Sequence, residues 1–283
     1  MGAKIIDGKE IASEIIEEIK LHINQFKKDI RPGLAVVLVG DDEASRTYVD
    51  MKEKMCHYVG IHSRVIKLDS TITEKELLQV IQELNADTEI HGILVQLPLP
   101  KHINEFTINE SILPQKDVDG FNPVNIGNLQ LNRASFIPCT PKGIIQLLKK
   151  VGIEIEGKEA LVVGRSNIVG KPTADLLLNE NATVTICHSK SKDLQKLCLR
   201  SDIIISAVGS PGLITDDMIK DGTVIIDAGT SMIDGKLVGD VKYDLCYKKA
   251  GYITPVPGGV GPMTIAMLMK NTLKAAKEAE EAV

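Results

Sequence analysis

Hydrophobic and polar residues alternate along the first third of the chain with two different periods. In EIASEIIEEIKLHINQF, isoleucines recur every four residues from Ile11 to Ile23, which predicts an amphipathic helix. GLAVVLVG is instead a continuous apolar run ending in glycine, as expected for a strand buried on both faces of a sheet. Similar stretches follow one another as far as the prolines of HGILVQLPLP. This alternation predicts βαβ units and a parallel sheet.

The helical stretches in this region have recognisable ends and faces. TEKELLQVIQELN begins with Thr73, a residue type that caps helices, and carries a helical apolar stripe. Residues 44–59 form another predicted helix, on which Tyr48 and Lys52 lie one turn apart and share a face. Tyr48 and Val59 belong to a stripe that can face inward. A lysine on a helix is most often solvated, so the pair alone does not predict a site.

The pattern breaks between Pro98 and Pro141, where prolines, asparagines and glycines crowd PQKDVDGFNPVNIGN. A long irregular segment inside a compact enzyme is usually functional or a linker, so a domain boundary is expected near residues 138–141. The alternation resumes in EALVVGR, TVTICH, DIIISAVG and GTVIIDAG, which predict a second parallel sheet. TIAMLMKNTLKAAKEAEEA predicts a long final helix.

Composition narrows the possible function classes. The length of 283 residues suits two domains. A net charge of −5 argues against a nucleic-acid-binding protein, which usually has a strong basic excess. The five cysteines are widely spaced and form no C-x-x-C, so neither a disulfide framework nor a zinc site is indicated. No apolar run is long enough to span a membrane and no signal core begins the chain, so a cytoplasmic location is expected.

VVGRSNIVGKP is a candidate nucleotide-binding turn. It places Gly164 after a buried strand and Gly170 at the start of a helix, where backbone N–H groups can face a pyrophosphate. Ser166 occupies the second glycine position of G-x-G-x-x-G, and Gly170 is displaced by one residue. A simple turn is therefore an equally good interpretation of this stretch alone.

The end of the next strand favours NADP over NAD. An NAD site has an acidic residue about 20 positions further on, which holds the ribose hydroxyls, but here the strand ends in CHSKS. His188, Ser189 and Lys190 can donate to a 2′-phosphate that an acid would repel. Arg165 can add a guanidinium fork suited to phosphate oxygens.

Candidate catalytic residues gather where strands of the first half end. Gln96 ends the strand in HGILVQLP, and Asp117 and Asp119 lie in KDVDGFNP. Ligands of open α/β sheets bind at the carboxyl ends of strands, although an Asp-Gly pair is usually only a turn. Near the C-terminus, ITPVPGGVGPMT contains three prolines and three glycines. This stretch is either a sharp connection or a rigid backbone wall beside a flat ligand.

Seven segments in chain order resemble the signature segments of the bifunctional methylenetetrahydrofolate dehydrogenase/methenyltetrahydrofolate cyclohydrolase family. They are SRTYVDMKEKMCHYVGI, GILVQLPLP, KDVDGFNP, PCTPKG, VVGRSNIVGKP, CHSK and ITPVPGGVGPMT. The resemblance implies that hydride passes from 5,10-methylenetetrahydrofolate to NADP. It also implies that water opens the methenyl product to 10-formyltetrahydrofolate in the same site, as a part of one-carbon metabolism.

The resemblance also implies roles for residues at matching positions. The catalytic positions comprise an essential lysine, a substrate-stacking tyrosine, a glutamine near the lysine and a folate-anchoring aspartate, at Lys52, Tyr48, Gln96 and Asp119. The cofactor contacts are expected at Gly164, Arg165, Ser166, Ser189 and Thr230, although many relatives carry isoleucine at the last position. The backbone wall of the folate site is expected at Pro257, Gly258 and Gly259.

The residue types suit this chemistry. The methenyl cation is already a good electrophile, so no metal is expected. A lysine with a lowered pKa can activate water and then deliver a proton to a ring nitrogen, while the neutral Gln96 orients the amine. Tyr48 offers a flat apolar face to an aromatic part of folate. Asp119 can accept hydrogen bonds from the N–H groups of the pterin.

The fold implied by the resemblance is two α/β domains with an active-site cleft between them. Residues 1–139 form the folate-binding catalytic domain, residues 140–263 form an NADP-binding, Rossmann-like parallel sheet, and helix 264–283 packs back on the first domain. A homodimer is expected. Three alternatives remain open: a monofunctional relative, an NADP-dependent dehydrogenase of another small substrate, and a nucleotide-sensing regulatory module. The ordered first-half segments speak against the last two.

Overall fold

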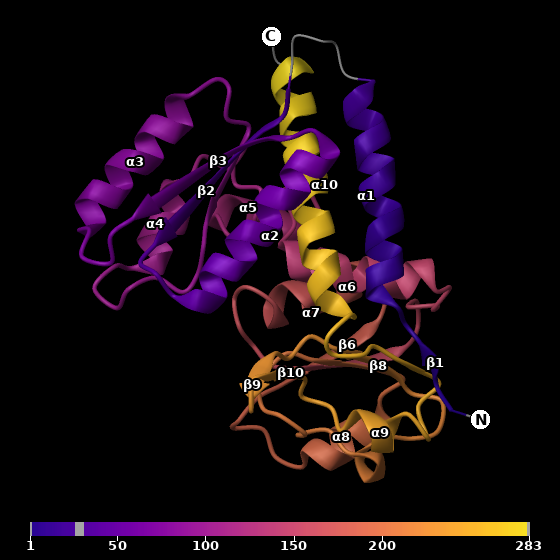
Figure 1. The fold of residues 1–283 in the computed structure, drawn as a ribbon. Helices are drawn as coiled ribbons and strands as arrows, with labels where there is room; N and C mark the ends of the chain where they lie inside the picture. Colours follow the sequence, from indigo (N-terminus) through magenta and orange to yellow (C-terminus); the bar gives the residue numbers. More distant parts are fainter. Residues whose placement is uncertain (1, 26–30, 282–283) are drawn as a thin grey trace. The chain divides into compact units, whose positions relative to one another are not determined.

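A computed structural model describes residues 2–25 and 31–281 of the protein (Figure 1). The chain divides into two compact units, and each unit is built from two separate parts of the sequence. One contains the chain up to Ser13 together with Thr140–Thr264. The other contains Glu14–Cys139 and the chain from Ile265 onward. We call them the six-stranded unit and the three-stranded unit after their main sheets.

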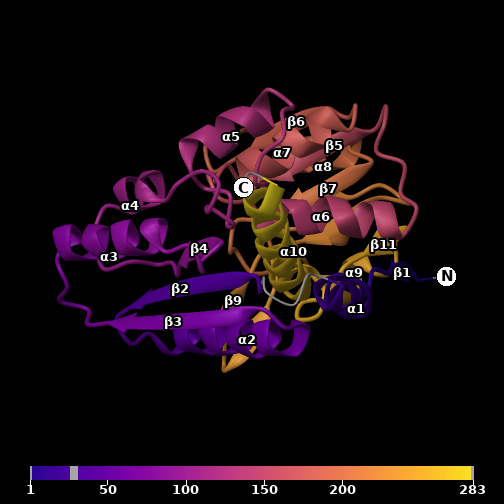
Figure 2. The ribbon, with the colours of Figure 1, turned by 90° about the horizontal axis from the view of Figure 1, so that it is seen from above.

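The three-stranded unit has a parallel sheet in the order β3-β2-β4. Its strands are β2 (Gly33–Val39), β3 (His62–Leu68) and β4 (Gly92–Val95). Every residue of β2 is buried, as its continuous apolar run predicts. Two views show α3 (Glu74–Ala86) and α4 (Glu105–Ser111) on one face of this sheet and α2 (Glu43–Val59) on the other (Figures 1 and 2).

Polar side chains cap the N-termini of three helices in this unit. Thr73 caps α3 through a capping box with Glu76, which confirms the predicted cap. The segment expected to be irregular also contains two short helices, α4 and α5 (Pro123–Gln130). Asn104 and Asn122 start them by accepting backbone N–H groups. Their few turns are too short to show a helical period in the sequence.

The six-stranded unit confirms the predicted Rossmann-like parallel sheet. Its strand order is β1-β11-β8-β7-β5-β6, and every pairing is parallel. The strands are β1 (Lys4–Ile5), β5 (Glu159–Val163), β6 (Thr183–Cys187), β7 (Ile203–Ser206), β8 (Val224–Asp227) and β11 (Tyr252–Ile253). Its helical segments are α6 (Cys139–Lys150), α7 (Gly170–Asn179), α8 (Leu194–Arg200), η1 (Asp216–Met218) and α9 (Tyr243–Cys246). An antiparallel pair, β9 (Ser231–Ile233) and β10 (Lys236–Val238), stands apart from this sheet.

The start of the chain lies in the six-stranded unit, whereas residues 1–139 were expected to form one domain. Strand β1 pairs with β11 at the edge of the six-stranded sheet (Figure 2). Ile6, directly after β1, is fully buried. The chain up to Ser13 therefore groups with Thr140–Thr264. The sequence could not reveal this, because a two-residue strand has no hydrophobic period. The boundaries between the units at Ser13 and Thr264 fall inside the helices α1 (Gly8–Asn24) and α10 (Val260–Glu281).

Candidate active site

Lys52 lies on the buried face of α2, next to residues that form the core. Val49, Cys56 and Val59 share this face, and Lys52 itself is only 8% exposed. Burial disfavours the charged ammonium and lowers the pKa of Lys52, although nearby Asp119 opposes the shift. The amine can therefore lose its proton at a lower pH than an ordinary lysine.

Gln96 fixes the position of this amine. The Nζ atom of Lys52 donates to Oε1 of Gln96 at 2.8 Å, and Nε2 of Gln96 donates to the carbonyl of Leu97 at 2.7 Å. The backbone N–H of Gln96 donates to the carbonyl of Val37 at 2.8 Å, which extends the pairing of β4 with β2. The rigid sheet thus holds the glutamine, and the glutamine orients the lysine without adding a charge.

Asp119 completes a cluster of ionisable groups in the three-stranded unit. The residue keeps some exposed surface, but burial of its carboxyl raises the pKa to about 6. Lys52 opposes this rise and Asp117 adds to it. The structure thus brings together three residues that sequence analysis singled out, Lys52, Gln96 and Asp119.

Asp117 shapes the turn that carries Asp119. Its carboxylate accepts the backbone N–H groups of Gly120, Phe121 and Asn122 at 3.0, 3.2 and 2.8 Å. Nδ2 of Asn125 donates to it at 2.8 Å. Asp117 is 2% exposed and has its acceptor positions occupied, so this first acid of KDVDG organises the turn.

Tyr48 differs from its expected place on an inward stripe. The residue is 38% exposed, whereas Val59 is 1% exposed on the same helix. The inward face of α2 instead includes Lys52, one turn further on. The exposed ring of Tyr48 leaves one aromatic surface available to a flat ligand.

The turn between β5 and α7 brings backbone segments very close together. Gly164 has a φ of +124°, and a Cβ atom at this position would lie 2.5 Å from the carbonyl oxygen of Ala207. A Cβ atom at Gly170 would lie 2.4 Å from the carbonyl oxygen of Gly164. Only glycine fits these two places, as expected for a nucleotide-binding turn.

Ser166 explains why this turn departs from the glycine pattern. Its Oγ atom accepts the backbone N–H groups of Val169 and Gly170 at 3.2 and 3.1 Å, at the start of α7. The hydroxyl still has its own hydrogen to donate. Serine at the second glycine position therefore holds two backbone N–H groups at the start of α7 and keeps one donor that can meet a phosphate oxygen.

The other predicted cofactor residues follow parallel strands of the same sheet. Arg165 follows β5, Ser189 follows β6 and Thr230 follows β8, and all three are exposed. Parallel strands have their carboxyl ends at one edge of a sheet, so these residues share that edge. Gly258, with a φ of +108°, and Gly259 lie in the turn before α10, in the six-stranded unit.

Two buried acids missed by sequence analysis hold the loops at this edge. The carboxylate of Asp240 accepts the hydroxyl of Ser206 at 2.9 Å and the N–H groups of Val208 and Ser210 at 2.9 and 2.6 Å. The carboxylate of Asp227 accepts the N–H groups of Gly229, Asp240 and Val241 at 3.0, 3.1 and 2.9 Å. They follow apolar runs in IIDAG and LVGD, but only the fold shows their partners.

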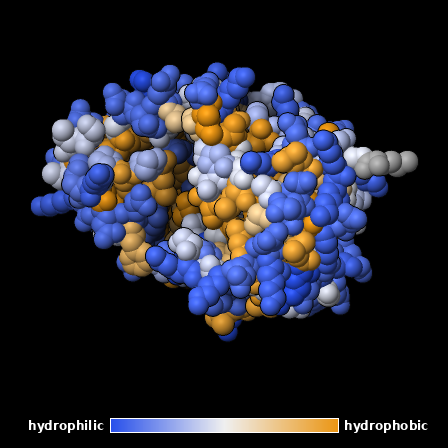
Figure 3. Space-filling model, turned by 90° about the horizontal axis from the view of Figure 1, so that it is seen from below, coloured by the Kyte–Doolittle hydropathy of each residue, from blue (hydrophilic) through white to orange (hydrophobic). Residues whose placement is uncertain are grey.

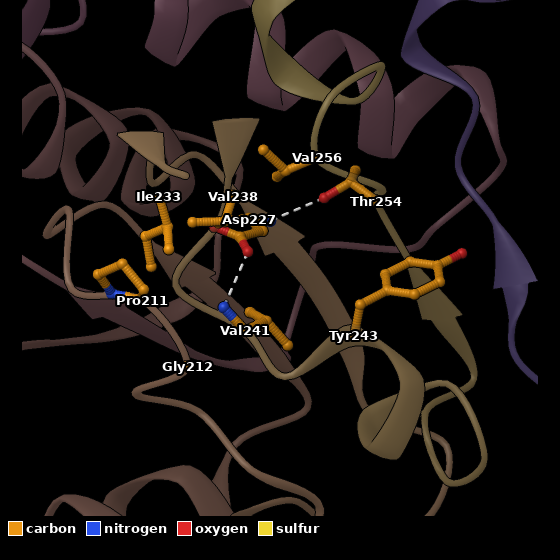
Figure 4. A pocket seen from close by; sticks show the side chains of 10 residues that line it. Pro211, Gly212, Asp227, Ile233, Val238, Val241, Tyr243, Thr254 and Val256 are labelled. Carbon is orange, nitrogen blue, oxygen red and sulfur yellow. Dashed lines mark hydrogen bonds between the residues drawn. The ribbon is translucent and has the colours of Figure 1, made fainter. Parts of the chain in front are cut away.

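Asp227 also borders a cavity of about 330 Å³ in the six-stranded unit (Figure 4). Val256, Tyr243 and Ile233 line it with mostly apolar surface. Burial raises the pKa of Asp227 to about 6. Its carboxylate is occupied by backbone donors rather than turned toward a ligand.

Comparison with known proteins identifies the family of this chain. Models of the tetrahydrofolate dehydrogenase/cyclohydrolase catalytic domain and NAD(P)-binding domain match residues 6–119 and 138–280. The chain belongs to the tetrahydrofolate dehydrogenase/cyclohydrolase family. The resemblance of the seven sequence segments to this family is thereby confirmed.

Full-length relatives in this family are similar to the chain over almost its whole length. The bifunctional protein FolD of Moorella thermoacetica is 56% identical over 98% of the chain and 100% of the relative. A crystal structure of bifunctional FolD from Campylobacter jejuni has a TM-score of 0.96 and 51% identity, covering 98% of this chain and 99% of that one. The Trypanosoma brucei dehydrogenase-cyclohydrolase, solved with NADP cofactor and inhibitor, has a TM-score of 0.95 and 40% identity, covering 99% of both chains.

The described residues were also compared with the requirements of a metal site and of a membrane-spanning helix. Among residues 2–25 and 31–281, no three or more His, Cys, Asp or Glu side chains form a group that could hold a metal ion. No helix in the same part of the chain is long and apolar enough to cross a membrane.

Proposed function

We propose that the protein carries out two consecutive reactions on one folate. It oxidises 5,10-methylenetetrahydrofolate to 5,10-methenyltetrahydrofolate with NADP and then hydrolyses this product to 10-formyltetrahydrofolate. One observation carries the proposal in a chain of this family: the buried amine of Lys52 is held by Gln96 at 2.8 Å and is close enough to Asp119 for their charges to interact.

The residues around Gly164 fit an NADP molecule. The close backbone approach at Gly164, the free hydrogen of the Ser166 hydroxyl and the N-terminus of α7 suit a pyrophosphate. Arg165 and Ser189 are proposed to hold the 2′-phosphate, and Thr230 is proposed to meet the cofactor beside the Asp227-held loop. The bound cofactor supplies the acceptor for the hydride.

Lys52 is proposed to move the proton in the hydrolysis. Its neutral amine accepts a proton from the water that attacks the methenyl carbon. It then gives the proton to the ring nitrogen, whose bond to that carbon breaks as the ring opens. The new hydroxyl group loses its own proton to solvent and becomes the formyl carbonyl. Burial favours the neutral amine, and Gln96 keeps its nitrogen in a single position.

Three further contacts are proposed to bind the folate. Asp119 accepts hydrogen bonds from the pterin N–H groups, which an ionised carboxylate does best. The exposed ring of Tyr48 stacks on a flat part of the substrate. The backbone of Pro257, Gly258 and Gly259 lines the folate, since a turn this poor in side chains lets a ligand approach closely.

We also propose that the protein is a cytoplasmic homodimer. All five cysteines are buried and take part in no disulfide, as suits a reducing compartment. Figure 3 shows hydrophobic residues gathered among hydrophilic ones on one face of the molecule. On β9, the hydrophobic side chains of Met232 and Ile233 are 64% and 47% exposed. The β9–β10 pair is therefore the proposed dimer contact in the six-stranded unit. If the dimer forms through this pair, sedimentation of a Met232→Glu variant should show monomers.

One absorbance assay tests the two reactions. With 5,10-methylenetetrahydrofolate and NADP, NADPH and methenyltetrahydrofolate are followed together, and methenyltetrahydrofolate is then supplied alone. We expect NADPH formation with little methenyl accumulation, and rapid decay of the added methenyl compound. Accumulation without enzymatic decay indicates a monofunctional dehydrogenase, and decay without NADPH indicates a cyclohydrolase alone. Equal kcat/KM for NAD and NADP contradicts the roles of Arg165 and Ser189.

A further inference from the structure

The turn that carries Asp119 is held by a side chain of α10. Asn271 is fully buried, and its Nδ2 atom donates to the carbonyl of Val118 at 2.8 Å and to the carbonyl of Ile137 at 3.0 Å. The same atom lies 3.7 Å from Sγ of Cys139. A single amide group thus joins two chain segments far apart in the sequence.

These two segments also meet directly. Sγ of Cys139 donates to the carbonyl of Val118 at 3.4 Å. Gly120 has a φ of +79°, and a Cβ atom there would lie 2.6 Å from the backbone nitrogen of Pro138. At Gly120 the turn therefore packs against residues 136–138 with no room for a side chain. The Asn271 amide bonds to both segments and holds them together.

The Asn271 bond acts on the peptide that leads into Asp119. The carbonyl of Val118 and the nitrogen of Asp119 belong to one planar group, so holding the oxygen also sets where the Asp119 backbone begins. On the other side, Asp117 holds the N–H groups of Gly120 and Phe121. Asp119 is the residue between these two anchors, so they fix the backbone from which its carboxyl projects. Cys139, in the segment that Asn271 also contacts, lies close enough to hydrogen-bond that carboxyl.

We propose that Asn271 is a positioning residue for folate binding, which acts by aiming the Asp119 carboxylate at the pterin. The inference rests on the proposed role of Asp119 as the folate anchor. Asn271 does not meet the substrate itself, because both of its amide hydrogens are given to backbone carbonyls in the core.

The neighbouring residue supplies a matched control. Thr272 is also fully buried on α10, but its hydroxyl donates only to the carbonyl of Leu268 within the same helix, at 2.9 Å. Thr272→Val removes one buried hydrogen bond of α10 and leaves the turn untouched. Asn271→Leu keeps the branched shape of the side chain but removes the bond to the turn at Val118 and the bond to Ile137.

The test is steady-state kinetics of both variants with 5,10-methylenetetrahydrofolate and NADP. For Asn271→Leu we expect the folate KM to rise at least tenfold, with the KM for NADP changed no more than in Thr272→Val. The melting temperature should fall further than in Thr272→Val, because two buried carbonyls lose their donor. A purely structural role predicts loss of stability with equal effects on both KM values, and that result overturns the proposal. If Asn271→Leu does not fold, Asn271→Ser, which keeps one donor and cannot overfill the core, is measured against the same outcomes.

A double mutant separates this inference from the role of Asp119. If Asn271 acts through Asp119, then Asn271→Leu raises the folate KM much less in an Asp119→Asn background than in the native one. Additive effects overturn the positioning role. Unchanged folate kinetics in Asp119→Asn alone contradict the proposed function of Asp119, whichever result Asn271 gives.

Discussion

A lysine amine beside a carboxylate would ordinarily stay charged, but burial shifts the balance at Lys52. The residue is 8% exposed and its pKa is lowered by burial. Its partner Gln96 is neutral, so the hydrogen bond orients the amine without stabilising the ammonium as a second carboxylate would. This balance lets one residue both take up and release a proton.

Replacing Lys52 should stop the hydrolysis. For Lys52→Met, which keeps a similar length of apolar chain, we expect cyclohydrolase kcat to fall by about 10²–10⁴-fold, the usual contribution of a proton-transferring group. The decay of methenyltetrahydrofolate absorbance measures it. Lys54→Met, at an exposed position of the same helix, is the control and should keep native activity. Full turnover in Lys52→Met contradicts the proposed role.

Folate affinity should depend on the ionisation of Asp119. Burial raises the pKa of this acid to about 6, so between pH 4 and 6 it is mostly protonated, whereas a solvated aspartate is mostly ionised. Protonation turns one carboxylate oxygen into a donor, which cannot pair with the N–H groups of the pterin. Affinity for 5-formyltetrahydrofolate should therefore fall about tenfold per pH unit below pH 6. Calorimetric titration measures it. Asp119→Asn should bind weakly with no such slope, and an unchanged slope assigns the effect to another group.

Only part of the candidate site could be predicted from the residues of the sequence. Lys52, Gln96 and Asp119 were found because their segments resemble a family, while spacing alone favoured a solvated lysine. Asn271 and Asp240 were missed because their partners lie far away in the sequence, at separations of 153 and 34 residues for Val118 and Ser206. A buried polar residue reveals its purpose only when its partners are known.

Among the elements, long apolar runs were the most predictable. The strands β2, β4, β5, β7 and β8 are almost entirely buried, and a continuous run of apolar residues identifies such strands without help from periodicity. The short helices α4 and α5, strand β1 and the β9–β10 pair were not predicted. Each is too short for a period, and asparagine caps or edge pairing hold it in place.

The strand–turn–helix element β5–α7 should bind NADP more weakly if its first glycine, Gly164, gains a side chain. In Gly164→Ala, a methyl group would lie 2.5 Å from the carbonyl of Ala207 at a φ of +124°. We expect the KM for NADP to rise more than tenfold while the folate KM changes little. Gly157→Ala also has a positive φ, +71°, but nothing lies within 4 Å of the added atom. Similar NADP kinetics in both variants contradict a special role for this turn.

At the scale of the whole molecule, both units draw on both halves of the chain. The three-stranded unit needs residues from Ile265 onward, and the six-stranded unit needs the chain up to Ser13. We expect residues 14–139 alone to lack a cooperative urea transition, because the carbonyls of Val118 and Ile137 lose Asn271. Fusing residues 265–283 through a flexible linker should restore the transition. A cooperative transition without them contradicts this view.

The interleaved ends also affect how the protein is made. A ribosome releases the chain from its beginning, so the three-stranded sheet emerges long before α10, which carries Asn271. Until that helix is synthesised, the turn around Asp119 lacks its partner and the apolar surface that α10 covers is open to other molecules. A product that lacks this helix would leave the carbonyl of Val118 without the Asn271 amide, and it would expose apolar surface to chaperones and proteases.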